Sequence, residues 1–156
     1  MSAFSGDVSA RKLAQTQVAA YRPGLEALLR VALSASKSGQ AFDVEREVTM
    51  TLDMAERHPH YVTVVAGSGE RVVGVVVASI EPDTDSAFIL WIATTPDVQR
   101  QGIGNRLIDH LQDSTRVSRV TGYVNLDDPV AVGFWTARGW RRVHPPPQRV
   151  LMGRGL

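Results

Sequence analysis

Apolar residues recur at helical spacing in several segments of the chain, with runs of β-branched residues between them. Residues 25–33 and 44–55 place apolar side chains three and four positions apart, which predicts two helices, the second capped by Asp43. The runs 61–66 and 71–80 flank a Gly-Ser-Gly-Glu turn and predict a β-hairpin. The first half of the chain is therefore expected to pair two helices with a hairpin.

The second half of the chain alternates in the same way. Residues 87–94 are apolar on both faces, as expected of a strand in the middle of a sheet. Residues 103–111 predict a helix that begins near Gly102, residues 119–126 a strand, and residues 127–139 another helix. This alternation predicts an α/β fold with a mixed sheet.

The two ends of the chain carry weaker patterns. Residues 11–18 predict a further strand, although the same pattern tolerates a helix. Beyond Gly139 we expect short strands, and residues 149–153 are predicted to end at an exposed edge of the sheet. Because exposed edges can pair across a two-fold axis, a homodimer is the corresponding hypothesis.

Length and composition limit the classes of protein that this chain can belong to. Its 156 residues are the usual size of one domain, so residues 1–156 are expected to form a single domain. No apolar run reaches the ~18 residues of a membrane span and no secretory signal is evident, which predicts a cytoplasmic protein without a membrane partner. The absence of cysteine excludes disulfides and thiolate metal sites, and a net charge of +1 gives no bulk attraction to nucleic acid.

Two glycines at the start of the helix near Gly102 indicate an anion site. The first amide groups of a helix lack partners within it, and the helix dipole favours an anion there. Gly102 and Gly104 leave the backbone open to a phosphate, and Arg106 adds positive charge. The alternative is that both glycines only form a tight turn. The donors around this turn are Gln99, Arg100, Gln101 and Asn105.

Two common nucleotide motifs do not fit this turn. A dinucleotide fingerprint would need a third glycine where the chain has Leu107. A P-loop would need a lysine in the turn, whereas the lysines of the chain are Lys12 and Lys37.

The turn instead resembles the pyrophosphate loop of the GNAT superfamily of acetyl-CoA-dependent N-acetyltransferases, whose pattern is Q/R-x-x-G-x-G/A. Here that pattern is Gln-Arg-Gln-Gly-Ile-Gly at residues 99–104. Residues 128–140 are similar to the second signature of the family, an N-x-x-A helix closed by Gly-aromatic, and the whole resemblance covers roughly residues 71–143. The matching positions of the second signature are Asp128, Ala131, Phe134, Gly139 and Trp140.

The resemblance implies a mixed, mostly antiparallel central sheet flanked by about four helices, with acetyl-CoA as cosubstrate. It implies that residues 92–94 pair with the pantetheine arm like an added strand, while amides of residues 99–105 hold the pyrophosphate. The implied reaction is direct attack of an amine on the thioester, which needs no thiol on the enzyme. The implied cofactor-binding residues are Ile92, Ala93, Thr94, Gln99, Arg100, Gln101, Gly102, Ile103, Gly104, Asn105, Asp128 and Phe134.

The chain departs from the family where acids and bases are expected. Phe88 stands where many members have a general-base glutamate, and Trp135 replaces a tyrosine that protonates the departing thiolate. Asp128 replaces the usual asparagine. An indole N–H is not a useful general acid at neutral pH, so the role of that tyrosine moves to another residue or is filled by water. Tyr123, on the strand after the cofactor helix, is a candidate acid if it faces the active cleft, with a half-buried structural tyrosine as the alternative.

The predicted function is acetyl transfer to a primary amine of a small molecule or peptide, bound between the N-terminal helices and the cofactor cleft. Two alternatives remain open. One is a sensor or interaction module that binds acyl-CoA with little turnover, and the other is a structural α/β protein. His58 and His60 around a proline predict a polar turn, and no metal site is assigned.

Overall fold

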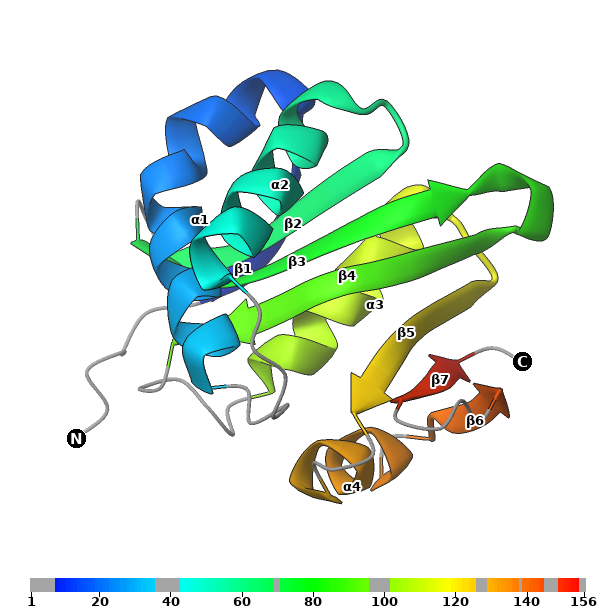
Figure 1. The fold of residues 1–156 in the computed structure, drawn as a ribbon. Coiled ribbons are helices and arrows are strands. Elements are labelled where there is room, and N and C mark those ends of the chain that lie inside the picture. Colours follow the sequence, from blue (N-terminus) through cyan, green and yellow to red (C-terminus); the bar gives the residue numbers. More distant parts are fainter. Residues whose placement is uncertain are drawn as a thin grey trace.

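A mixed sheet organises the part of the chain that the computed structural model describes, namely residues 8–35, 43–68, 71–95, 102–125, 129–137, 139–144 and 149–154. Its strands are β1 (Ser9–Leu13), β2 (Tyr61–Ser68), β3 (Arg71–Glu81), β4 (Ser86–Thr94), β5 (Arg119–Asn125), β6 (Arg141–His144) and β7 (Arg149–Arg154). Within the described residues these seven strands lie in the order β1-β2-β3-β4-β5-β7-β6 (Figure 1). β4 and β5 are parallel, and the other neighbouring pairs are antiparallel.

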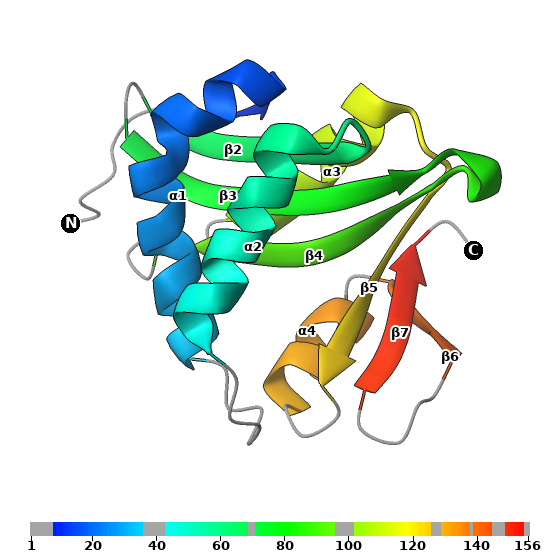
Figure 2. The same ribbon diagram turned by 45° about the horizontal axis from the view of Figure 1, so that its top comes forward.

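Helices cover both faces of this sheet. They are α1 (Gln15–Ala35), α2 (Val44–Arg57), α3 (Ile103–Thr115) and α4 (Pro129–Ala137), and the 3-10 turn η1 (Pro82–Thr84) joins β3 to β4. α1 and α2 lie on one face, α3 lies on the other, and α4 lies beside β5 (Figures 1 and 2). Each face has its own apolar core, one under α1 and α2 and one under α3. The predicted α/β fold, with a mostly antiparallel sheet and about four helices, is confirmed.

The apolar pattern of the sequence predicted the central elements correctly. Val48, Leu52 and Ala55 of α2 are buried, and the Asp43 side chain accepts a hydrogen bond from the amide of Arg46 as a helix cap. The predicted hairpin is β2 and β3. β4 lies between β3 and β5, in agreement with its being apolar on both faces.

The N-terminal segment differs from the prediction. A strand forms over Ser9–Leu13, but the predicted strand is wrong from Gln15 onward, where α1 begins. The reason is a helix cap: the amide of Ala14 donates to Oε1 of Gln17 at 2.8 Å, which satisfies an amide at the first turn. α1 then continues through Pro23. No described helix, α1 included, is both long enough and apolar enough to cross a lipid bilayer.

The C-terminal strands also correct the sequence analysis. The prediction that residues 149–153 end at an exposed edge is wrong, because β7 lies between β5 and β6 and pairs with both. Its pairing with β5 extends from Val120↔Arg154 to Asn125↔Arg149. Among the described strands, the edges of the sheet are β1 and β6.

Ion pairs connect α1 to α2 above the sheet. Arg22 of α1 lies 2.9 Å from carboxylate oxygens of both Asp53 and Glu56 of α2. The hydrogen bond with Glu56 is the main cause that raises the pKa of Arg22 above its ordinary value. A second pair, Arg30 with Glu45, joins the end of α1 to the start of α2. Because the side chains are partly exposed, these pairs orient the helices more than they stabilise the fold.

A buried hydroxyl group under α1 and α2 gives a stability prediction. Thr63 is 2% exposed, and its Oγ1 has no hydrogen-bond partner among the described residues. Leaving such a group unsatisfied costs about 1–3 kcal/mol. Thr63→Val keeps the shape and removes the hydroxyl, so we expect the free energy of unfolding to rise by roughly 1 kcal/mol in urea denaturation. A decrease would mean that the hydroxyl group has a partner after all.

Candidate functional site

β4 and β5 pair over only part of their length. Their parallel register extends from Ser86↔Arg119 to Ile89↔Gly122, after which β4 continues beside β3 and β5 continues beside β7. The strands separate at that point, and Figure 2 shows β5 lying with β7 and α4, away from the end of β4. No other described strand pairs with the freed edge of β4. The residues on this part of β4 include Ile92, Ala93 and Thr94.

A bulge marks the point of separation. Val77 of β3 pairs with Trp91, but the next residue, Ala78, pairs with Ile89, so Leu90 is an extra residue in β4. Leu90 and Trp91 accordingly both pack against the core under α1 and α2. A bulge bends its strand and redirects the neighbouring side chains, and here it does so where the unpaired edge of β4 begins.

α3 begins with amide groups that no side chain caps. Gly102 is the N-cap, its φ of 75° lies in the left-handed region that favours glycine, and no side chain makes a capping hydrogen bond there. The amide of Arg106 donates to the carbonyl of Gly102 at 3.1 Å, which is the first hydrogen bond of the helix. The first turn of α3 contains no acidic residue. The amides left without a partner in the helix are therefore those of Ile103, Gly104 and Asn105.

The first turn of α3 packs directly on the sheet at Gly74 of β3. A Cβ atom at Gly74 would lie 3.0 Å from Cγ2 of Ile103 and 3.1 Å from Cδ1 of Leu107, closer than ordinary contact. Gly74 also pairs with Thr94, so this residue fixes the end of β4 and the start of α3 relative to each other. Sequence reasoning missed Gly74, although a single glycine in a β-branched strand is a known sign of close backbone approach.

Gly74→Ala should displace the first turn of α3 and destabilise the fold. We expect the free energy of unfolding to fall by about 1–2 kcal/mol, the usual cost of overpacking a core. Gly24→Ala is the matched control, because a Cβ atom at Gly24 in α1 would meet no atom within 4 Å. Urea denaturation of both variants measures the difference, and a stable Gly74→Ala protein would contradict the close packing.

Several predicted site residues lie partly or wholly outside the described structure. Gln99, Arg100, Gln101 and Asp128 are not among the described residues. Tyr123 lies in β5, one residue beyond its last pair with β4, and Phe134 lies in α4, but the positions of their side chains are not described. Their roles stay predictions.

Arg106, which was expected to add charge at the glycine turn, is engaged elsewhere. Its guanidinium group donates to the carbonyl oxygen of Val8 at 2.8 Å, next to β1. The positive character of the turn in the described structure therefore comes from the backbone amides and the dipole of α3.

Trp135 has a structural role at the end of α4. Gly139, with a φ of 84°, follows the helix, and the amides of Gly139 and Trp140 donate to the carbonyls of Thr136 and Trp135 at 3.1 Å. This is a Schellman motif, which an apolar contact between its two ends usually accompanies. Here the ring centroids of Trp135 and Trp140 are 4.8 Å apart, and Trp140 is buried. The indole of Trp135, which replaces the expected tyrosine, therefore stabilises the C-terminus of α4 through its contact with Trp140.

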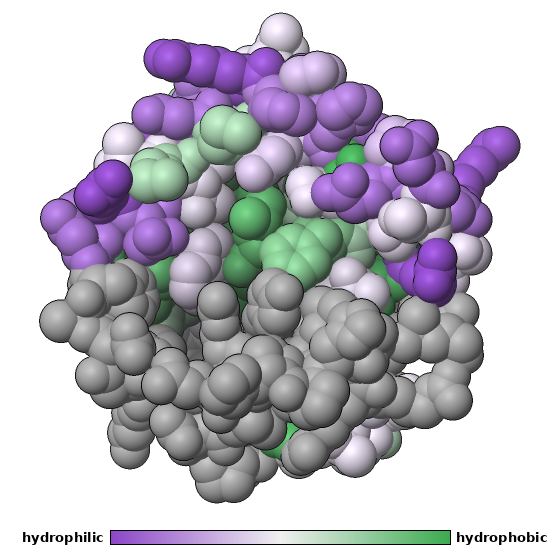
Figure 3. Space-filling model, turned by 45° about the vertical axis from the view of Figure 1, so that its right-hand side comes forward, coloured by the Kyte–Doolittle hydropathy of each residue, from purple (hydrophilic) through white to green (hydrophobic). Residues whose placement is uncertain are grey.

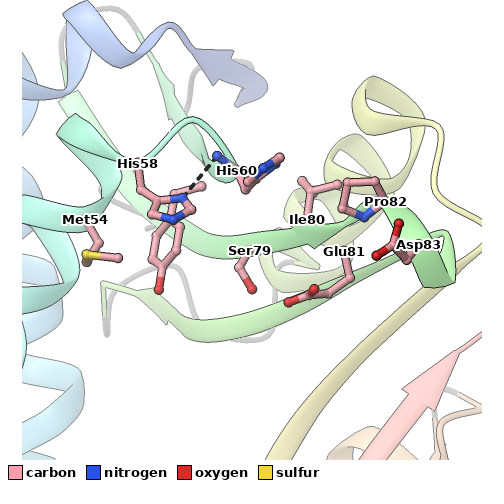
Figure 4. Close-up of a pocket in the computed structure, with 9 residues that line it drawn as sticks. Met54, His58, His60, Ser79, Ile80, Glu81, Pro82 and Asp83 are labelled. Carbon is pink, nitrogen blue, oxygen red and sulfur yellow. Dashed lines mark hydrogen bonds between the residues drawn. The ribbon is translucent and has the colours of Figure 1, made fainter.

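A pocket of about 520 Å³ lies where α2, β2 and β3 meet (Figure 4). His58 and His60 lie on the turn between α2 and β2, and the amide of His60 donates to Nδ1 of His58 at 3.3 Å, which confirms the predicted polar turn. No group of three His, Cys, Asp or Glu residues in the described segments is placed to hold a metal ion. The lining residues are Met54, His58, His60, Tyr61, Ser79, Ile80, Glu81, Pro82 and Asp83.

Comparison with known sequences gives the family. The model of the Acetyltransferase (GNAT) family matches residues 26–140, which is most of the chain. The chain belongs to the GNAT family of acetyltransferases. It is 29% identical over 98 residues to L-2,4-diaminobutyric acid acetyltransferase of Nocardia farcinica (strain IFM 10152), a match that covers 60% of this chain and 51% of that protein. The chain thus spans about half the length of this curated relative.

Solved structures show the same fold at low sequence identity. PaiA N-acetyltransferase from Thermoplasma acidophilum, in complex with coenzyme A, matches with a TM-score of 0.75 at 14% identity over 95% of this chain and 98% of that chain. The ribosomal-protein-S18-alanine N-acetyltransferase from Escherichia coli matches with a TM-score of 0.64 at 16% identity, over 94% and 92% of the two chains. Both likenesses concern the fold.

Acetyl-CoA is the acyl donor of the GNAT family, and the described geometry fits it. The amides of Ile103, Gly104 and Asn105, which have no partner within the helix and no acidic neighbour in that turn, fit a pyrophosphate. The unpaired edge of β4 fits an extended arm that carries amide groups.

Proposed function

We propose that this chain, as a single acetyltransferase domain over residues 1–156, transfers an acetyl group from acetyl-CoA to a primary amine. The observation that carries the proposal is the combination of a free edge on β4 with a bare helix start at α3. Because Gly74 packs against α3 and pairs with Thr94 of β4, the two features form one frame. Such a frame can bind a pyrophosphate and an extended arm at the same time.

The pyrophosphate site in this proposal consists mainly of backbone groups. The amides of Ile103, Gly104 and Asn105 donate to the phosphate oxygens, together with donors from residues 99–101 of the preceding loop. The left-handed conformation of Gly102 turns the chain into the helix without placing a side chain in the site.

The arm lies along β4 in the same proposal. It pairs with backbone groups of residues 92–94, and Asp128 and Phe134 line it further along. Since the pyrophosphate lies beyond the C-terminal end of β4, the arm extends from there toward the N-terminal end of the strand. Its reactive end then lies near the bulge at Leu90, where β4 and β5 separate.

Acetyl-CoA supplies an activated acyl carbon: the amine nitrogen bonds to it, the C–S bond breaks, the amine loses a proton and the thiolate gains one. Phe88 has no group that accepts a proton, and Trp135 is engaged in closing α4. We therefore assign to the chain the tasks of binding and orienting both reactants, with solvent carrying the proton from the amine. Tyr123 stays the candidate donor of the proton to the thiolate.

The acceptor in this proposal is an amine of a small molecule or a peptide. The name of the Nocardia relative, which specifies a diamino acid, supports a small acceptor with more than one amino group.

A cytoplasmic location and a homodimer also stay predictions. A dimer that extends the sheet would have to use β1 or β6, and sedimentation velocity at micromolar concentration tests whether a dimer exists.

Release of the CoA thiol from acetyl-CoA, measured over a panel of primary amines and short peptides, tests the proposed function. We expect turnover with at least one amine and an acetylated product in the mass spectrum. Binding of CoA without thiol release for any amine would contradict acetyl transfer and favour an acyl-CoA-binding module. Absence of CoA binding would contradict both.

A further inference from the structure

We infer that the pocket at the C-terminal end of α2 binds a second ammonium group of the acceptor, which makes a linear aliphatic di- or polyamine the acceptor class. The inference rests on the proposed function for the acetyl-transfer step and adds a site for the far end of the acceptor. The pocket, about 520 Å³, has a volume typical of small-molecule sites.

A row of paired residues leads from this pocket across the sheet to β4, just before the point where its edge becomes unpaired. Tyr61 of β2 pairs with Ser79 of β3, and Ser79 pairs with Phe88 of β4. Residues directly opposite each other in such pairs lie on the same face of a sheet. That face is the one under α1 and α2, because Tyr61 packs against their core. The row therefore ends at Phe88, two positions before the bulge at Leu90.

The far end of the pocket carries two carboxylates. Ser79 and Glu81 point to the same side of β3, and Asp83 follows on η1 (Figure 4). None of the salt bridges between described residues includes Glu81 or Asp83. The cation of the adjoining strand, Arg119, donates to the carbonyl oxygen of Thr84 at 2.9 Å. Both carboxylates are thus available to pair with an ammonium group of a ligand.

The rings that line the pocket are compatible with a cation. Nδ1 of His58 accepts a hydrogen bond from the amide of His60, which orients the imidazole ring at the pocket. The ring centroids of His58 and Tyr61 are 5.1 Å apart, and the face of a tyrosine ring attracts an ammonium group.

Distances along the strands give the length of the acceptor. Glu81 pairs with Ser86, which is four positions before Leu90, or about 14 Å at 3.4 Å per residue. The level of Ser79 and Phe88 is about 7 Å from Leu90 on the same scale. Bonds of about 1.5 Å advance a zigzag chain by about 1.25 Å each, so the two nitrogens are roughly six to eleven bonds apart.

The surface between the two ends suits methylene groups. Phe88, which is half-buried, lies between the bulge and the level of Glu81. Figure 3 shows apolar side chains exposed in the middle of one face, with hydrophilic side chains around them on the described part of that surface. An apolar residue at the position of the expected general base is therefore consistent with an acceptor that has an aliphatic middle.

Isothermal titration of the CoA-saturated protein with 1,8-diaminooctane and n-octylamine tests the inference, because the two amines differ in one terminal nitrogen. We expect the diamine to bind at least about tenfold more tightly, and 1,3-diaminopropane, which is too short, to bind like the monoamine. The double variant Glu81→Gln, Asp83→Asn should lose the preference for the long diamine. Asp113→Asn, an exposed change on α3 across the sheet, should retain it.

Equal affinity for the long diamine and the monoamine, or an unchanged preference in the double variant, would overturn the inference. Measuring thiol release distinguishes a failure of this inference from a failure of the proposed acetyl transfer. If no amine releases the thiol while the preference in binding persists, acetyl transfer fails and the pocket stands. If both long amines are acetylated with equal kcat/KM in the wild type and the double variant, acetyl transfer stands and the pocket fails.

Discussion

Gly104→Glu should abolish the binding of acetyl-CoA. The unpaired amides at the start of α3 and the helix dipole favour an anion, and a carboxylate there would face the pyrophosphate. Two like charges about 4 Å apart repel by about 4 kcal/mol at the effective dielectric constant of a protein surface. That energy corresponds to a loss of affinity of roughly a thousandfold, which isothermal titration measures directly.

Gly104→Gln is the control for this variant, because glutamine has nearly the volume of glutamate without its charge. The difference in affinity between the two variants then isolates the electrostatic contribution. Circular dichroism and thermal melting establish that both are folded. A folded Gly104→Glu protein that binds acetyl-CoA like the wild type would show that the pyrophosphate lies elsewhere.

The elements that depend on local pattern could be predicted from the sequence. The stripe of α2 with its Asp43 cap, the hairpin of β2 and β3, and the start of α3 at Gly102 each depend on residues within a few positions of one another. The exception at this level is the start of α1. Gln17 caps the helix through a single side-chain contact, which outweighs a pattern that suited a strand equally well.

The features that shape the site depend on pairing between distant segments, and the apolar pattern does not report them. β4 is apolar on both faces, so its apolar pattern looks the same with or without a bulge. The extra residue at Leu90 nevertheless shifts the register between β4 and β3. The separation of β4 from β5 after Ile89 is likewise a feature of strand pairing, because β5 continues beside β7 alone from Tyr123 onward. No property of β4 alone predicts where its edge becomes free.

The residues that line the pocket could have been predicted in part from the register of the predicted hairpin. His58 and His60 were correctly interpreted as a polar turn, and β2 and β3 were correctly predicted to pair. The register places Tyr61 opposite Ser79, which brings the turn next to Glu81 at the end of β3. Extending the hairpin residue by residue would have revealed this cluster, whereas the volume of the pocket required the position of α2.

The rate of acetyl transfer should rise with pH until the pH reaches the pKa of the acceptor amine. Only the neutral amine attacks, and an unperturbed alkyl amine has a pKa near ~10. Because Phe88 cannot accept the proton, we expect the substrate itself to be the titrating group. We expect kcat/KM for n-octylamine to rise about tenfold per pH unit, or about a hundredfold between pH 7 and pH 9, without a plateau near neutral pH.

Two variants test the two residues considered as donors of the proton to the thiolate. Trp135→Phe keeps an aromatic contact with Trp140 at the end of α4. We therefore expect kcat/KM to stay within about tenfold of the wild type, which is a change of ~1.4 kcal/mol in the activation free energy, with the same pH profile.

Tyr123→Phe removes the candidate acid. If Tyr123 protonates the thiolate, this variant should lower kcat well beyond tenfold, whereas a structural tyrosine should leave the pH profile as it is in the wild type.

A second amine of lower pKa decides whether substrate or protein titrates. For a fluorinated alkyl amine, the whole profile of kcat/KM should move to lower pH by the difference between the two amine pKa values, because the fraction of neutral amine determines the rate. The general base of a protein would instead hold the midpoint at one pH for both amines. A midpoint that stays fixed near neutral pH would contradict the solvent route, and its loss in Tyr123→Phe would identify that phenol as the group that titrates.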